Sequence, residues 1–140
     1  IIDDTYNASV ASTKAALDLL GSYQGYRIFV LGDMGELGAD ARAYHEEIGE
    51  HAIGTGIDNL YSLGVLSQSA SEVFNGHGGK HFGSLQSLVE SVLQRLTEQT
   101  GKQPVTVLVK GSRSAHMERV VAAIQQAVAV SDSVEDKHAC

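Results

Sequence analysis

Short apolar runs alternate along the chain with segments whose apolar residues recur at helical spacing. The continuous apolar run at 27–31 and the β-branched run at 105–109 are typical of strands buried on both faces of a sheet. In the segment 84–99 apolar residues repeat at i, i+3, i+4 and i+7, which predicts an amphipathic helix. The full pattern predicts strands at 1–4, 27–31, 59–63, 80–82 and 105–109, and helices at 10–20, 40–55, 67–74, 84–99 and 114–128.

The alternation of strands and helices indicates βαβ units. We therefore expect a Rossmann-like α/β fold with a mostly parallel sheet and helices on both faces. Ser9 is placed to cap the first helix, and Tyr44, Ile48 and Ala52 are expected on one face of the helix at 40–55. In parallel sheets ligands bind beyond the carboxyl ends of the strands. That edge carries residues 4–7, 32–33, 64 and 110–113.

Length and composition indicate one globular domain. The chain has 140 residues, a net charge of −7 and no run of Lys or Arg, which argues against a nucleic-acid surface. No apolar run approaches the roughly 18 residues of a membrane span, and no signal peptide is visible. The only cysteine, Cys140, leaves no internal disulfide and fits the reducing cytoplasm. Because the chain opens on a strand without Met, we expect it to be part of a longer protein.

The segment 4–7 lies between the first strand and the first helix. A carboxylate such as Asp4 can accept hydrogen bonds from a ribose diol, and an amide such as Asn7 can read an adenine edge. The alternative is a capping cluster, because helix starts are often rich in Asp, Asn and Ser. Both interpretations stay open at this point. Asp3 and Asp4 are adjacent in a strand, so their side chains are expected on opposite faces.

The glycine-rich loop at 32–38 has the spacing G-x-x-G-x-x-G, which is not the dinucleotide fingerprint. Asp33 and Glu36 would repel a pyrophosphate, so a structural loop or one that holds a cationic group is favoured. No Walker A motif occurs, so the chain should not bind a triphosphate unaided. His45 and His51 are six residues apart on one helix and cannot chelate one ion from one face. We expect no metal site there and a packing or capping role for His45.

The segment 110–113 follows a buried strand and opens the last predicted helix. Two cations, Lys110 and Arg113, meet backbone N–H groups there, which suits a carboxylate or a phosphate. The alternative is a tight turn with solvated cations. No Ser/His/Asp or Cys/His triad is supported, so we assign no catalytic residue.

Several motifs together resemble the C-terminal domain of the Mur ligases. They are Asp-Asp-Thr-Tyr-Asn-Ala at 3–8, Leu-Gly-Asp-Met-Gly-Glu-Leu-Gly at 31–38, His45 followed by Gly49, Gly-Ile-Asp at 56–58, and Leu-Val-Lys-Gly-Ser-Arg at 108–113 followed by Met-Glu at 117–118. The resemblance covers residues 1–128, and the polar segment 129–140 is expected to be a disordered tail. One departure is Ser9-Val10, where many relatives carry Asn-Pro.

The resemblance implies a three-domain enzyme of peptidoglycan precursor synthesis. Among the Mur ligases, the motifs are most similar to those of the member that adds D-alanyl-D-alanine to UDP-N-acetylmuramoyl-tripeptide through an acyl phosphate, with ATP and Mg²⁺. The P-loop and the Mg²⁺ ligands are expected in a central domain that this chain lacks, so the chain alone should be inactive. The implied partners are these small molecules and the rest of the same polypeptide, without nucleic acid or membrane.

The resemblance also assigns expected roles to individual residues. Asp4 would bond the ribose hydroxyls, and Tyr6 and Asn7 would lie against the adenine. On the acceptor side, Lys110, Ser112 and Arg113 are expected to meet the dipeptide carboxylate, and Asp33 to orient its ammonium group. The alternative function is a self-contained α/β module that binds a nucleotide or a protein without catalysis. A Mur ligase for a different amino acid is disfavoured by Tyr6-Asn7 and by Lys-Gly-Ser-Arg.

Overall fold

The structure is a computed structural model that describes residues 1–5, 8–35, 37–74 and 78–139, with side chains described as far as residue 130. Every strand and helix predicted from the sequence is present. The elements are β1 (Ile2–Asp4), α1 (Val10–Ser22), β2 (Tyr26–Gly32), η1 (Gly38–Asp40), α2 (Ala41–Gly54), β3 (Asn59–Leu63), α3 (Gln68–Val73), β4 (Gly79–Phe82), α4 (Leu85–Gln99), β5 (Val105–Lys110), η2 (Arg113–Ala115) and α5 (Glu118–Ala139).

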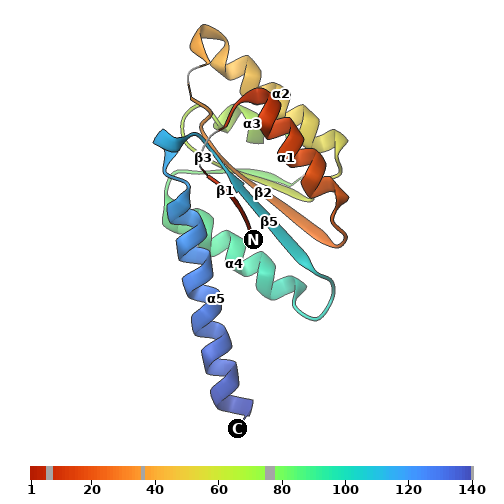
Figure 1. Ribbon diagram of the computed structural model, residues 1–140, viewed down its shortest axis with the longest axis vertical. Helices are drawn as coiled ribbons and strands as arrows, with labels where there is room; N and C mark the ends of the chain where they lie inside the picture. The colour runs from red at the N-terminus through yellow and green to blue at the C-terminus, as the bar shows by residue number, and fades with distance from the viewer. Residues whose placement is uncertain (6–7, 36, 75–77, 140) are drawn as a thin grey trace.

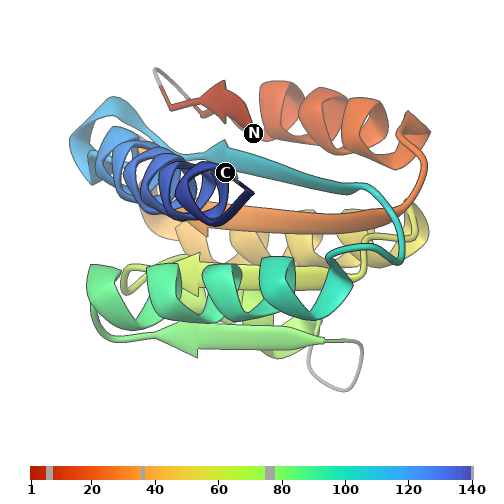
Figure 2. The same ribbon diagram turned by 90° about the horizontal axis from the view of Figure 1, so that it is seen from below.

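The five strands form one parallel sheet in the order β1-β5-β2-β3-β4. The chain crosses the sheet in one direction from β1 to β4 through α1, α2 and α3, and then returns to β5 through α4. A right-handed crossover ties the direction of travel to the face on which the connecting helix lies. Accordingly α1, α2 and α3 cover one face, and α4 and α5 cover the other (Figures 1 and 2). The predicted α/β class and parallel sheet are confirmed.

Two hydrophobic cores lie on the two faces of the sheet. Strand β2 supplies both, because Phe29 and Leu31 pack with α1 and α2 while Ile28 and Val30 pack with α4 and α5. All four side chains are fully buried. A strand covered on both faces must be apolar at every position, which explains the uninterrupted apolar run in the sequence.

The buried face of α2 carries His45, Ile48, Gly49 and Ala52. Tyr44, expected on one face with Ile48 and Ala52, is 37% exposed. His is a polar residue, yet His45 is stable in the interior because backbone groups pair with both of its ring nitrogens.

The last helix also differs in its bounds. Helix α5 begins at Glu118 and continues to Ala139, and its C-terminal part extends away from the sheet (Figure 1). The helix thus runs through residues for which the sequence predicts a disordered tail, and the division of the chain at Val128 stays a prediction. No helix within the described residues is long and apolar enough to cross a membrane.

Ser9 caps α1 as predicted, and the cap is a complete capping box. Its hydroxyl accepts from the N–H of Ser12, whose own hydroxyl accepts from the N–H of Ser9. We expect Ser9→Ala to lower the free energy of unfolding by about 1 kcal/mol, because an N-terminal N–H loses its acceptor. Urea denaturation measures the change. Ser22→Ala, at the exposed end of the same helix, is the control, and an equal loss in both variants would contradict the cap.

Candidate functional site

The carboxyl ends of β1, β5 and β2 bring the predicted site residues to one edge of the sheet. Asp4 is the last residue of β1, Lys110 is the last residue of β5, and the two are register partners. Asp33 follows β2 directly. Tyr6 and Asn7, predicted to contact adenine, lie outside the described residues, and so does Glu36.

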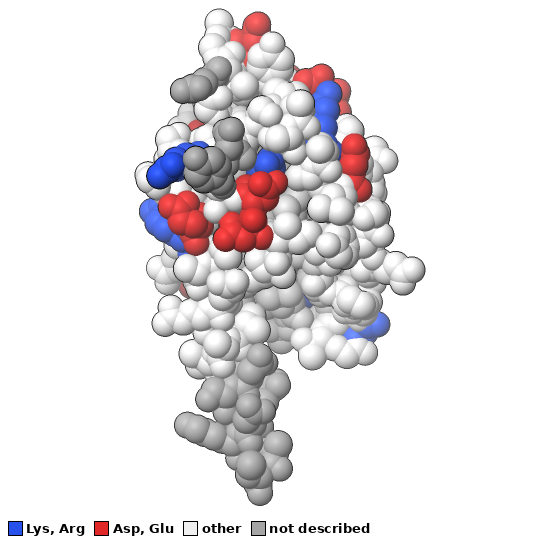
Figure 3. Space-filling view, in the orientation of Figure 1, with Lys and Arg blue, Asp and Glu red and all other residues white. Residues whose placement is uncertain are grey.

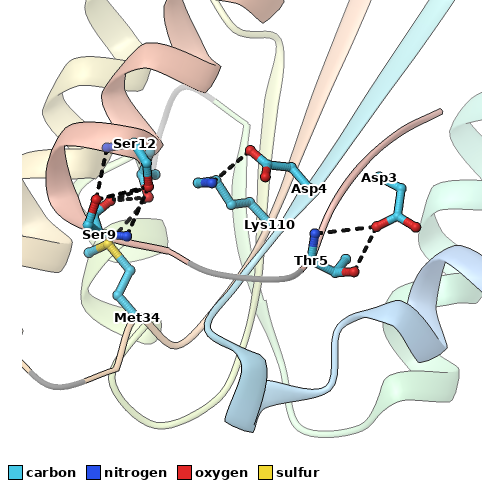
Figure 4. A network of polar contacts seen from close by, with 8 residues as sticks. Asp3, Asp4, Thr5, Ser9, Ser12, Met34 and Lys110 are labelled. Carbon is cyan, nitrogen blue, oxygen red and sulfur yellow. Dashed lines mark hydrogen bonds and ion pairs between the residues drawn. The ribbon is translucent and has the colours of Figure 1, made fainter.

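Lys110 forms an ion pair with Asp4. Its Nζ lies 2.7 Å from Asp4 Oδ2, and the lysine side chain is 2% exposed against 40% for the aspartate (Figure 4). No described residue donates a hydrogen bond to Asp4 Oδ1. Lys110 is therefore placed to hold Asp4, and this position does not support the expected contact with a dipeptide carboxylate.

The segment 110–113 does not open a long helix. Lys110 ends β5, residues Arg113–Ala115 form the short helix η2, and His116 in a left-handed conformation (φ 53°) separates η2 from α5. The predicted start of the last helix at residue 114 is therefore wrong, and the convergence of Lys110 and Arg113 on one ligand stays a prediction. Ser112 is buried, and its backbone N–H donates to the carbonyl of Asp33 at 2.9 Å. This bond ties the loop after β5 to the loop after β2.

Among the hollows lined by described residues, the first at this edge lies beside β1. It has a volume of about 440 Å³ and is lined by Asp3, Asp4, Thr5, Arg113 and Glu118. We call it the β1 hollow; acidic and basic side chains gather over the end of β1 and the start of α5 (Figure 3). Asp4 and Arg113, expected on opposite sides of the site, therefore line the same hollow.

Two acids of the β1 hollow have local partners. The side chain of Asp3 accepts from both the N–H and the hydroxyl of Thr5, so it is directed away from Lys110, as the strand alternation predicts (Figure 4). The pKa of Glu118 lies below its ordinary value, chiefly because its own backbone N–H donates to the carboxylate, and also because His116 bonds it. Asp4 is thus the acid of this hollow that is fixed by a buried cation.

The second hollow lies beyond β2, β3 and β4 and has a volume of about 550 Å³. We call it the β3–β4 hollow. Its lining includes Asp33, Leu63, Gly64, Val65, Gln68, His81, Phe82, Gly83, Ser84, Leu85, Ser114, Ala115 and Arg119. Asp33 Oδ1 accepts from the N–H of Ser67 at 2.7 Å. The structure thus places Asp33 in a different hollow from Asp4 and Arg113.

His45 positions the loop that carries Asp33. Its Nε2 accepts from the N–H of Met34 at 3.0 Å, and its Nδ1 lies 2.7 Å from the carbonyl of Ala41. Since a carbonyl only accepts, Nδ1 carries the proton and the ring has no free nitrogen for a metal. The predicted packing role is confirmed. Among the described residues, no group of three or more His, Cys, Asp or Glu side chains could hold a metal ion.

Sequence reasoning missed His81, Gln68 and Arg119, which line the β3–β4 hollow. The signal that could have found His81 is its place near the carboxyl end of β4. That strand is short and half-polar, so the sequence predicts it only weakly, and the predicted ligand edge does not include its end.

A comparison of the sequence with known protein families supports the resemblance that the motifs indicate. The family described as "Mur ligase, glutamate ligase domain" matches residues 1–113. The chain belongs to the Mur ligase family. This confirms the resemblance that the motifs carry.

Relatives in the Mur ligase family match most of the chain. The UDP-N-acetylmuramoyl-tripeptide–D-alanyl-D-alanine ligase of Escherichia coli K12 is 44% identical over 126 residues, which are 90% of this chain and 27% of that protein. The ligase of the same name from Bacillus subtilis 168 is 36% identical over 123 residues, 86% of this chain and 27% of that protein. The chain therefore spans about a quarter of the length of these relatives.

Solved structures of Mur ligases share the fold. MurF from Acinetobacter baumannii superposes with a TM-score of 0.76 at 30% identity, over 87% of this chain and 27% of that one. The MurF ligase from Thermotoga maritima, solved in complex with ADP, superposes with a TM-score of 0.70 over the same 87% of this chain and 27% of that chain. At 24% identity, the second likeness concerns the fold alone.

Proposed function

We propose that this chain is the C-terminal part of an ATP-dependent ligase that adds D-alanyl-D-alanine to UDP-N-acetylmuramoyl-tripeptide. The observation that carries the proposal is the match to ligases of that name over most of the chain, at up to 44% identity. In the proposed reaction ATP converts a carboxylate into an acyl phosphate, and attack by the dipeptide amine displaces phosphate. The proposed location is the cytoplasm.

We assign the β1 hollow to the nucleotide. Asp4 offers Oδ1 to the ribose hydroxyls while Lys110 holds Oδ2, and Arg113 lies in the same hollow. Tyr6 and Asn7 stay predicted contacts of the adenine. The P-loop and the Mg²⁺ ligands are proposed to belong to the rest of the polypeptide, so these residues bind only the sugar and base of ATP.

We assign the Asp33 side of the edge to the acceptor dipeptide. A carboxylate held by the N–H of Ser67 can accept from an incoming ammonium group. Ser112 supports Asp33 through the backbone bond between their loops. An acyl phosphate must be shielded from water until the amine arrives, which explains why two substrates would meet at one edge of a domain that closes over the reaction.

The test is Asp4→Asn in the full-length ligase. We expect the KM for ATP to rise roughly 5- to 10-fold, because the neutral amide oxygen of Asn replaces a charged acceptor, at a cost of about 1–1.5 kcal/mol. The KM for D-alanyl-D-alanine should change far less. Steady-state phosphate release measures both constants, at a temperature where melting curves show that the variant is folded.

The matched control is Asp18→Asn, which removes the same charge from a surface acid paired with His51 on α1 and α2. It should leave both KM values unchanged. An unchanged ATP KM in Asp4→Asn would remove Asp4 from the nucleotide site. Phosphate release by this chain alone with all substrates would contradict the proposal, and nucleotide binding without any such reaction in the full-length protein would favour the self-contained module.

A further inference from the structure

We propose that the β3–β4 hollow binds the acceptor dipeptide and that His81 Nε2 accepts a hydrogen bond from its peptide N–H. This inference rests on the proposed ligase function and adds a residue that recognises the acceptor as a peptide. His81 lines the hollow together with Asp33.

A chain of hydroxyl groups fixes the tautomer of His81. The hydroxyl of Ser71 donates to the carbonyl of Gln68 at 2.8 Å, so its single proton is used. The hydroxyl of Ser62 donates in turn to Ser71 Oγ at 2.9 Å. Ser62 Oγ then has only lone pairs for His81 Nδ1, which lies 2.8 Å away and must carry the N–H. The neutral ring therefore presents Nε2 as an acceptor.

Buried serines make this arrangement specific. Ser62 and Ser71 are at most 3% exposed, so neither can exchange its partner for water. No residue in the described part of the chain donates to His81 Nε2. An acceptor on a half-buried side chain that lines a hollow needs a donor from a ligand or from water, and a peptide N–H is such a donor.

The other polar groups of the hollow match the two ends of a zwitterionic dipeptide. Asp33 offers Oδ2, to which no described residue donates, for the ammonium group. Gly64 fits Asp33 closely, because a Cβ there would lie 2.4 Å from Asp33 Oδ1. The Nε–H of Arg119 donates to the carbonyl of His116, so the two terminal amino groups of the guanidinium can bind a carboxylate.

The apolar part of the lining suits small side chains. Leu63, Phe82, Leu85 and Ala115 line the hollow together with the charged groups. A volume of about 550 Å³ is ample for two alanine residues. The hollow thus offers an anion, a neutral acceptor, a cation and an apolar wall, which are the complements of an ammonium group, a peptide N–H, a carboxylate and a methyl group.

The experiment compares D-alanyl-D-alanine with D-alanyl-D-lactate in the full-length ligase, because the second carries an ester oxygen in place of the peptide N–H. We expect the wild-type protein to favour the dipeptide by about tenfold in kcat/KM, the cost of one hydrogen bond lost to an unpaired acceptor. His81→Leu should use both acceptors equally. His81→Gln, whose amide oxygen can accept, should regain most of the preference.

The possible outcomes distinguish failure of this inference from failure of the proposed function. An unchanged preference in His81→Leu, or no preference in the wild-type protein, would overturn the role of His81 while leaving the ligase function intact. Absence of any turnover of D-alanyl-D-alanine by the wild-type protein would instead overturn the proposed function. The KM for ATP should stay within about twofold in both variants, since the nucleotide is assigned to the β1 hollow, and a parallel rise in that KM would also count against a specific acceptor contact.

Discussion

Replacing Gly49 with alanine should lower the free energy of unfolding by about 2–4 kcal/mol. Gly49 lies where α2 packs on α3, and a Cβ there would be 2.5 Å from the carbonyl oxygen of Ala70 and 3.2 Å from its carbonyl carbon. These are backbone atoms of a packed helix and cannot rotate away. Overpacking of this kind usually costs 1–3 kcal/mol, and more where the backbone has to move.

Gly54→Ala supplies the matched control within the same helix. Apart from its chain neighbours and the nearby backbone of its own helix, no described heavy atom lies within 4 Å of the Cβ position of Gly54, and its φ is not positive. That substitution should raise stability by about 0.5–1 kcal/mol, because alanine loses less backbone entropy in a helix. Urea unfolding of the two variants measures the difference. Equal stabilities would show that α3 is not held against α2 at Gly49.

Asp4→Asn should destabilise the fold by about 3 kcal/mol, which is more than the loss caused by Lys110→Met. The two partners differ in exposure, since the lysine is 2% and the aspartate 40% exposed. Removing the carboxylate takes the negative charge of Asp4 away from a buried ammonium group, and breaking a buried ion pair in this way is costly. Removing the ammonium leaves a carboxylate that water can solvate, and Met keeps most of the buried volume. We expect about 1 kcal/mol for Lys110→Met.

Denaturant titration of both single variants gives this order directly. The double variant Asp4→Asn with Lys110→Met should recover part of the loss of Asp4→Asn, because no charge is then left in the interior. A greater cost for Lys110→Met than for Asp4→Asn would mean that the packing of the lysine stem outweighs the charge. It would also weaken the view that Lys110 serves to hold Asp4.

The elements and the ligand edge could be predicted because their causes are local. Apolar runs at 27–31 and 105–109 are long enough for strands buried on both faces, and the confirmed alternation with helices then implies a parallel sheet. The carboxyl-end rule brought Asp4, Asp33 and Lys110 to one edge without any knowledge of strand order. Their places in the structure agree with that expectation.

The direction of each side chain at that edge could not be predicted, since it depends on strand order. Lys110 meets Asp4 because β5 lies between β1 and β2 in the sheet. The two residues are 106 positions apart, and no local sequence pattern predicts that contact. Arg113 lines the same hollow as Asp4, and it lies on η2, a short helix before α5 that the sequence pattern did not predict. The role of His81 could not be predicted for another reason. It depends on hydrogen bonds through Ser62 and Ser71, and the sequence does not distinguish these two serines from other polar residues.

The edge position of β1 has a thermodynamic consequence. Among the described residues, strand β1 pairs with β5 over Ile2 to Asp4, and it lies at the edge of the sheet. Its detachment and the binding of any ligand to Asp4 are then linked equilibria, because the ligand binds only the attached strand. Occupancy of the β1 hollow would slow amide hydrogen exchange along β5, the strand next to β1 in the sheet, by keeping β1 in place.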